Sequence, residues 1–178
     1  MGHFYFVRHG ETVWNVENKI CGCTDSPLTQ RGHEQARRLG EKIAGEHLHI
    51  DEICCSPLSR AQDTAREISR VIGVPVTVEP RLREQNFGKW EGTARDGVRF
   101  LEEKANFVQN FDGGESMLRL CQRIYNLLDE ITAQPDRVVL LVAHNGISRA
   151  VQSYFTSMEN AEYAAFGIGN CEIRRFDF

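Results

Sequence analysis

The sequence predicts one α/β domain over residues 1–178, a three-layer α/β/α sandwich with a mostly parallel central sheet. Strand-like and helix-like stretches alternate along the chain. Residues 137–143, RVVLLVA, are apolar almost throughout, as in a strand that helices cover on both faces. In such sheets ligands bind beyond the carboxyl ends of the strands, so residues that carry chemistry are expected directly after them.

The first half of the chain predicts three strands separated by two helices. The strands are residues 4–7, 50–56 and 74–79, and the helices are residues 29–46 and 57–73. Thr29 is a residue type that caps helix N-termini, and apolar residues follow it at helical spacing. Pro57 near the start of the second helix and Gly73 beyond its end are typical helix boundaries.

The second half predicts three further helices and two strands. Residues 94–111 are expected to be helical in part. Gly113-Gly114 interrupt the helical pattern before an amphipathic helix over 115–134. The apolar strand follows, and residues 146–157 open a helix directly after it. In residues 171–178, CEIRRFDF, apolar and polar residues alternate enough to predict a final edge strand.

Bulk composition excludes several classes of partner. The chain has 41% hydrophobic and 26% charged residues, an ordinary globular composition. Its net charge of −4 gives no reason to expect a nucleic-acid partner. No apolar run approaches the length of a membrane span, so a cytoplasmic protein with no membrane partner is expected. The sequence leaves a homodimer open.

The six cysteines predict neither a metal site nor disulfides. They are Cys21, Cys23, Cys54, Cys55, Cys121 and Cys171. The spacing of Cys21 and Cys23 is not that of a zinc ribbon. Cys54 and Cys55 are adjacent in an expected strand, so their side chains should point to opposite faces. We therefore expect free thiols, no metal and no cofactor.

Polar side chains follow the expected strands, as the fold class requires. Arg8 and His9 follow the first strand, Arg60 comes shortly after the second, Glu84 after the third, and His144 after the apolar strand. The carboxyl ends of parallel strands meet at one edge of a sheet, so these groups should converge there.

Two arginines, two histidines and one carboxylate fit phosphoryl transfer without a metal. Arginine forks match tetrahedral oxyanions, and a neutral imidazole can attack phosphorus to form a covalent intermediate. A carboxyl group can protonate a leaving alkoxide and then deprotonate the attacking water. Phosphomonoester hydrolysis through a phosphohistidine uses every one of these groups.

Five segments, in this order along the chain, resemble the histidine phosphatase superfamily, the phosphoglycerate-mutase-like enzymes. They are VRHGETVWN, CGCTDSPLTQRGHEQA, CSPLSRAQDTA, LREQNFGKWEG and VAHNGISRA, with DGGESM before the last. The resemblance implies the phosphoglycerate-mutase-like fold and a histidine phosphatase of the phosphatase branch.

The resemblance also implies a role for each matching residue. His9 would be the phosphorylated nucleophile and Glu84 the proton donor and later the base. Arg8, Arg60 and His144 would hold the phosphoryl oxygens. The remaining substrate-binding residues implied are Asn15, Cys21, Gly22 and Asn145. Position 21 departs from the family, whose members often carry Gln there, and a thiol is a poor hydrogen-bond donor.

Two other functions stay open beside a phosphatase acting on a small phosphorylated metabolite. One is a mutase, which returns the phosphoryl group to a retained substrate, and the other is a module that binds a phosphate ligand without catalysis. An idle module has no need of the leaving-group acid Glu84. The short stretch from Trp90 to Gly113 and the early end of the chain favour hydrolysis, because the family's mutases generally carry a longer lid and a tail.

The substrate is the least determined part of the prediction. We expect the pocket wall to come from residues 86–114, including Arg95, Arg99, Phe100 and Phe107. Arg95 and Arg99 are four residues apart and could share a helix face toward a second anionic group, but solvated positions are the expectation for both.

Overall fold

The computed structural model describes residues 1–178 and confirms an α/β fold built on a five-stranded sheet. The strands are β1 (His3–Arg8), β2 (Glu52–Cys55), β3 (Val76–Val78), β4 (Val139–Ala143) and β5 (Ile173–Asp177). The helices are α1 (Val13–Val16), α2 (Gln30–Gly45), α3 (Ser59–Ile72), α4 (Val98–Lys104), α5 (Met117–Thr132), α6 (Asn145–Phe155) and α7 (Asn160–Ala165). Two short 3-10 turns, η1 (Pro80–Leu82) and η2 (Gly88–Trp90), lie between β3 and α4.

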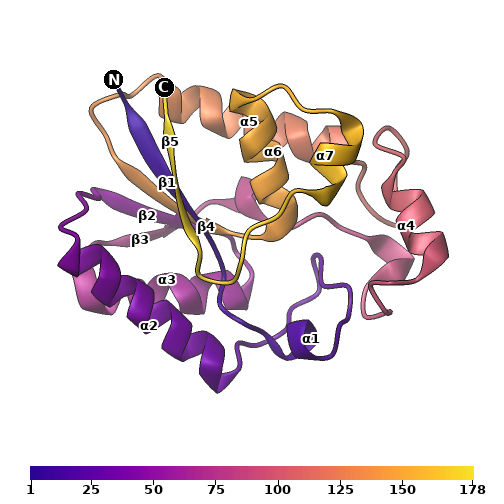
Figure 1. Ribbon diagram of the computed structural model, residues 1–178, viewed down its shortest axis with the longest axis horizontal. Helices are drawn as coiled ribbons and strands as arrows, with labels where there is room; N and C mark the ends of the chain where they lie inside the picture. Colours follow the sequence, from indigo (N-terminus) through magenta and orange to yellow (C-terminus); the bar gives the residue numbers. More distant parts are fainter.

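The strands lie in the order β3-β2-β4-β1-β5, as Figure 1 shows for the central part of the molecule. The first four are parallel, and β5 pairs with β1 in the antiparallel sense at one edge. Arg8 of β1 lies opposite Ala143 of β4, and Cys55 of β2 lies opposite Val142. The carboxyl ends of these three neighbouring strands are therefore nearly level, which brings the residues after them together.

Two hydrophobic cores separate the three layers of the sandwich. Phe4 and Phe6 of β1 pack with α5 and α6 on one face, whereas Tyr5 and Val7 pack with α2 and α3 on the other. All five residues of β4 are buried, as its apolar sequence predicts. Each fully buried large apolar side chain stabilises the fold by roughly 1.5–3 kcal/mol relative to an exposed one.

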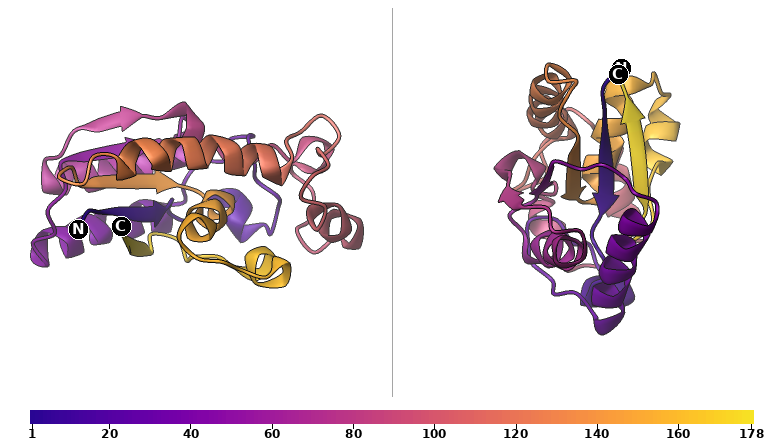
Figure 2. Two further views of the ribbon diagram at one scale, coloured as in Figure 1. Left: turned by 90° about the horizontal axis from the view of Figure 1, so that it is seen from above. Right: turned by 90° about the vertical axis from the view of Figure 1, so that its left-hand side faces the viewer.

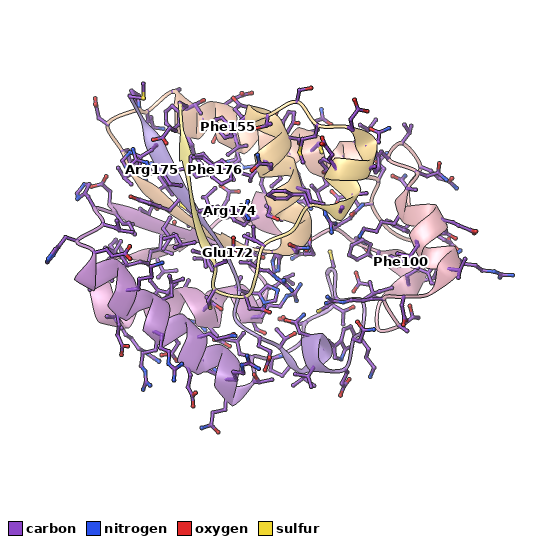
Figure 3. All side chains as sticks on the ribbon, in the orientation of Figure 1. Phe100, Phe155, Glu172, Arg174, Arg175 and Phe176 are labelled. Atoms are coloured by element: carbon purple, nitrogen blue, oxygen red, sulfur yellow. The ribbon has the colours of Figure 1, made fainter.

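The edge strand and the cysteines follow the predicted pattern. Cys54 packs against the α5–α6 core and Cys55 lies in the α2–α3 core, so the two side chains point to opposite faces. All six cysteines are free. On β5, Phe176 packs inward against Phe155 of α6 with ring centroids 5.6 Å apart, whereas Arg175 beside it points outward and is exposed (Figure 3).

Caps explain where the predicted helices begin and end. The Thr29 side chain accepts a hydrogen bond from the N–H of Gly32 at the start of α2, and Ser116 accepts one from Arg119 at the start of α5. Gly73 ends α3 with a left-handed φ of 73°. The sequence analysis missed α1 and α7, each of six residues or fewer and held by a capping box.

The helix α4 lies at the end of the molecule opposite the two termini, which lie side by side (Figure 2). It is held to the body by an aromatic cluster in which Phe87 packs edge-on against Phe100, with ring centroids 5.6 Å apart. The arrowhead of β4 points toward this end, so α4 stands beyond the carboxyl edge of the sheet. No helix is long and apolar enough to span a lipid bilayer.

Candidate active site

A pocket with a volume of about 120 Å³ opens at the carboxyl edge of the sheet, between that edge and α4. Thirteen residues line it: Arg8, His9, Asn15, Ile20, Cys21, Glu84, Phe87, Arg95, Phe100, Lys104, Asn145, Gly146 and Arg149. Six of the nine predicted site residues are among them. Phe100, labelled in Figure 3, carries the α4 side of the wall.

His9 is held in one tautomer by its neighbour in the chain. Its Nδ1 lies 2.7 Å from the carbonyl oxygen of Gly10, which can only accept, so Nδ1 carries the proton. The Nε2 atom then keeps its lone pair. Burial, followed by the guanidinium groups of Arg60 and Arg8, holds the pKa of His9 well below its usual range. His9 is therefore a neutral imidazole with an available nitrogen.

Arg8 lines the pocket beside His9 with part of its guanidinium unused. Its Nη1 donates to the carbonyl of Ile168 over 2.8 Å, whereas the buried Nε has no partner. Burial, and next the charge of Arg95, lower the pKa of Arg8 to about 10, so it remains a cation at neutral pH. Its Nη2 makes no hydrogen bond to the protein and is available to a ligand oxyanion.

Glu84 is buried and fixed through both carboxyl oxygens. Oε2 accepts a 2.9 Å hydrogen bond from the N–H of Gly146, and Oε1 accepts one of 2.9 Å from Gln85. Gly146 belongs to the first turn of α6, directly after β4. Two backbone donors thus set the position of the only carboxylate in the pocket wall.

Arg60 and His144 lie together beneath the pocket rather than in its wall. Arg60 Nε donates to His144 Nδ1 over 3.2 Å, so His144 carries its proton on Nε2 and donates it to Ser56 Oγ at 2.7 Å. The ring centroids of His144 and His9 are 5.2 Å apart. Burial, and then the charge of Arg60, hold the pKa of His144 well below its usual range.

The loop that carries Cys21 and Gly22 is fastened to Arg60. The carbonyl of Gly22 accepts from Arg60 Nη2 over 2.7 Å, and a Cβ at position 22 would lie 2.2 Å from the carbonyl oxygen of Gln85. Only glycine fits this close approach. Cys21 lines the pocket, but its Sγ is directed to the carbonyl of Thr24 at 3.4 Å.

Asn15 and Asn145 line the pocket with their amide oxygens already engaged. Asn15 Oδ1 accepts from the N–H of Thr12 and from Asn170 Nδ2, and Asn145 Oδ1 accepts from the N–H of Ile168. Each amide is therefore oriented with its NH₂ group free. Both side chains can donate to an anionic ligand.

Three further cations line the pocket. Arg95 and Phe100 line the pocket, as the predicted wall requires, but the expectation that the Arg95 side chain is solvated was wrong. Arg95 precedes α4, and its Nε donates to the carbonyl of Lys19 over 2.8 Å. Arg99 is exposed, as expected, and neither it nor Phe107 lines the pocket, contrary to the predicted wall. Phe107 packs instead against Tyr163 in the core.

Lys104 and Arg149 were missed by the sequence analysis. Arg149 lies one helical turn after Asn145 on α6, and this spacing was the available signal. Lys104 is the last residue of α4. It reaches the pocket only because the segment around α4 crosses the pocket, and no sequence signal indicates this. No group of three or more His, Cys, Asp or Glu side chains is arranged to hold a metal ion. A reaction without a metal remains a prediction.

The sequence matches a known family over nearly its whole length. Residues 4–178 match the model of the histidine phosphatase superfamily, branch 1. The chain is 35% identical over 182 residues to a probable phosphoglycerate mutase of Erwinia tasmaniensis, an alignment that covers 97% of this chain and 83% of that protein.

Two solved structures, described as a phosphatase and a putative phosphatase, are similar to this one. A mycobacterial glucosyl-3-phosphoglycerate phosphatase has a TM-score of 0.83 at 30% identity, over 98% of this chain and 89% of that one. An Escherichia coli protein described as a putative α-ribazole-5'-P phosphatase has a TM-score of 0.84 at 26% identity, over the same shares of 98% and 89%.

Proposed function

Because the chain belongs to the histidine phosphatase superfamily, we propose that it hydrolyses a small phosphorylated metabolite through a phosphohistidine on His9. The observation that carries the proposal is the state of His9. Its Nδ1 proton is donated to Gly10, and Nε2 is unprotonated in a pocket that also holds Arg8 and Glu84. These are a nucleophile, an oxyanion partner and an acid within one cavity.

The reaction proceeds in two steps that use the same groups. His9 Nε2 attacks phosphorus, the ester P–O bond breaks, and protonated Glu84 gives its proton to the leaving alkoxide. Water then attacks the phosphohistidine, Glu84 takes the water's proton, the N–P bond breaks and inorganic phosphate leaves. Glu84 is protonated again at the end, so the cycle closes.

The phosphoryl oxygens are held by the guanidinium and amide donors around the nucleophile. Arg8 supplies its unengaged Nη2, and Asn15 and Asn145 supply their free NH₂ groups. Arg60 gives one N–H of Nη2 to the carbonyl of Gly22, which leaves the second N–H of that nitrogen. In the proposal this remaining N–H donates a hydrogen bond to the bound phosphoryl group from the buried floor of the pocket, where Arg60 lies.

His144 acts in the proposal through its bond to Arg60. Both of its ring nitrogens are engaged, one by Arg60 and the other by Ser56. A direct contact with a phosphoryl oxygen would require Nε2 to exchange Ser56 for the ligand. His144 therefore serves in the proposal to fix Arg60, whose remaining Nη2 proton is the donor that this pair directs at the transferred group.

A mutase is the second candidate, and it is favoured by the names of the sequence relatives, of which the Erwinia tasmaniensis protein is one. Hydrolysis is supported by the names of the structural neighbours and by the small size of the segment that covers the pocket. Between η2 and α5 the only helix over the pocket is α4, with seven residues. A phosphohistidine lasts long enough to be transferred back only where water is kept out.

The test combines an activity panel with trapping of the intermediate. The wild-type protein is expected to hydrolyse phosphomonoesters in the presence of EDTA and to carry an acid-labile, base-stable phosphate that His9→Ala lacks. Loss of activity on chelation would overturn the metal-free mechanism, and absence of the labelled intermediate would overturn the role of His9. Production of 2-phosphoglycerate from 3-phosphoglycerate without phosphate release would assign the mutase reaction instead.

A further inference from the structure

We propose that the substrate carries a second anionic group besides the transferred phosphoryl group, and that Arg95, Lys104 and Arg149 bind it. This inference rests on the proposed function, because it names the substrate class of the same site. The group is a carboxylate or a second phosphate on a short, compact molecule.

The first argument is the absence of ion pairs around the pocket. The structure contains fourteen ion pairs of an Arg or Lys with a carboxylate, yet none involves Arg8, Arg95, Lys104 or Arg149. Elsewhere most arginines have a carboxylate partner. A cation withdrawn from water without a counter-charge is costly, so its persistence in a concave site points to a bound anion.

The second argument is the way in which two of these side chains are fixed. Arg149 is 8% exposed, and its Nε donates to the carbonyl of Phe166 over 2.8 Å. Arg95 is anchored in the same way to the carbonyl of Lys19. In both residues the two terminal nitrogens make no hydrogen bond to the protein, which leaves a fork of N–H donors for a planar or tetrahedral oxyanion.

Lys104 completes the cluster from α4, and its Nζ has no hydrogen-bond or ion-pair partner in the structure. Burial, and next the charge of Arg149, lower the pKa of Lys104 to about 8, with a smaller contribution from Arg95. All three cations line the same pocket. An anion bound among them would return the pKa of Lys104 toward its ordinary value.

The third argument is the balance of charge. The pocket wall holds four cations, and its one carboxyl group, Glu84, is protonated in the proposed mechanism when the ester binds. A phosphomonoester dianion neutralises two of these four positive charges. Two positive charges then remain, and a carboxylate or a second phosphate neutralises one or both, whereas a substrate whose remainder is uncharged leaves them uncompensated in a partly dehydrated site.

Three-carbon probes test the inference directly, because they differ only in the second group. 3-Phosphoglycerate carries a carboxylate, glycerol 1,3-bisphosphate carries a second phosphate, and glycerol 3-phosphate carries neither. We expect kcat/KM for one of the two doubly anionic probes to exceed that for glycerol 3-phosphate by about tenfold to a hundredfold, the range of charge-assisted hydrogen bonds. The probe with the larger advantage identifies the second group.

Variants of the cluster should reduce that advantage. Arg95→Gln, Lys104→Gln and Arg149→Gln are each expected to lower kcat/KM more for the preferred doubly anionic probe than for glycerol 3-phosphate. The matched control is Arg99→Gln, four residues from Arg95 but exposed and outside the pocket, and it should keep the wild-type ratio. Calorimetric binding of the probes to the inactive His9→Ala protein gives the same comparison without catalysis.

The outcomes separate this inference from the proposed function. If phosphomonoesters are hydrolysed through His9 but all three probes are used equally, and the variants leave their ratios unchanged, the second anion site is wrong and the phosphatase stands. If no phosphomonoester is hydrolysed or isomerised and the His9→Ala protein binds the probes without preference, both the proposed function and the second anion site are wrong. Preferential binding without turnover would support the anion site and overturn the phosphatase.

Discussion

The backbone N–H of Gly146 donates a 2.9 Å hydrogen bond to Glu84 Oε2, and this bond ties the first turn of α6 to the proposed acid. A Cβ at position 146 would lie 2.4 Å from Glu84 Oε1, which is closer than non-bonded atoms approach. The carboxyl group therefore occupies space that only a glycine leaves free. The position of the proposed acid depends on this residue as much as on its own.

Gly146→Ala should displace Glu84 and slow the reaction. A misplacement of about 1 Å in a reacting group can cost on the order of a hundredfold in rate. We expect a loss of tenfold or more on alkyl phosphates, measured as kcat, with a smaller loss on p-nitrophenyl phosphate, whose leaving group needs little acid help. Gly45→Ala is the matched control, because no atom lies within 4 Å of a Cβ built there. Wild-type rates for Gly146→Ala on both esters would contradict the prediction.

Glu84→Gln should slow esters with poor leaving groups most. A positioned acid contributes about a hundredfold to ten-thousandfold to such a reaction, and the amide cannot supply the proton. Steady-state kinetics on a series of esters with rising leaving-group pKa should give a steeper dependence in the variant. An equal loss on p-nitrophenyl phosphate and on alkyl phosphates would count against the assignment.

The same substitution should also lower stability. Both oxygens of Glu84 accept backbone N–H groups, from Gln85 and from Gly146. The NH₂ of a glutamine must face one of these donors, and a buried donor without an acceptor costs about 1–3 kcal/mol. Chemical denaturation measures this loss separately from the kinetics.

The fold was predictable because the strongest local signals agree with the tertiary structure. Residues 139–143 of RVVLLVA form β4 and are all buried, and Thr29 caps α2 as its residue type indicates. The short helices α1 and α7 were not predicted, since four to six residues give too little periodicity to distinguish a helix from a loop.

The pattern of strands predicted the site residues that directly follow strands, whereas the resemblance to the family was needed to find loop residues such as Asn15 and Cys21. His9 and His144 come directly after paired parallel strands, so their proximity follows from the sheet. Arg95 and Lys104 reach the pocket only through the path of the segment around α4. Their side chains resemble solvated surface cations in sequence, and burial, which distinguishes them, is a property of the folded chain.

Stability should fall as the pH is lowered below about 6.5, because the pKa values of His9 and His144 are held well below that value by burial and by nearby arginines. The unfolded chain takes up protons near pH 6.5, whereas the folded chain does not until a lower pH. The free energy of unfolding therefore decreases with falling pH by up to about 1.4 kcal/mol per pH unit for each such histidine.

His9→Asn removes one of these protonation sites and should flatten that dependence by up to one proton. Denaturant unfolding at a series of pH values between 7 and 5 measures the slope. His47→Asn changes an exposed histidine and serves as the control, with the wild-type slope expected. An identical slope in His9→Asn and the wild type would show that His9 is not kept neutral by the fold.

Asn170→Ala should weaken substrate binding although Asn170 does not line the pocket. Its Nδ2 donates to the carbonyl of His9 over 2.8 Å and to Asn15 Oδ1 over 3.3 Å, so it sets which way the Asn15 amide faces. Loss of one hydrogen bond of about 1 kcal/mol corresponds to about a fivefold rise in KM. Asn126→Ala, at an exposed position of α5, is the matched control.

If Asn170 acts through Asn15, the double variant with Asn15→Ala should lose little more substrate affinity than Asn15→Ala alone, because the two residues act as a unit. Additive losses would show instead that Asn170 supports only the backbone of His9.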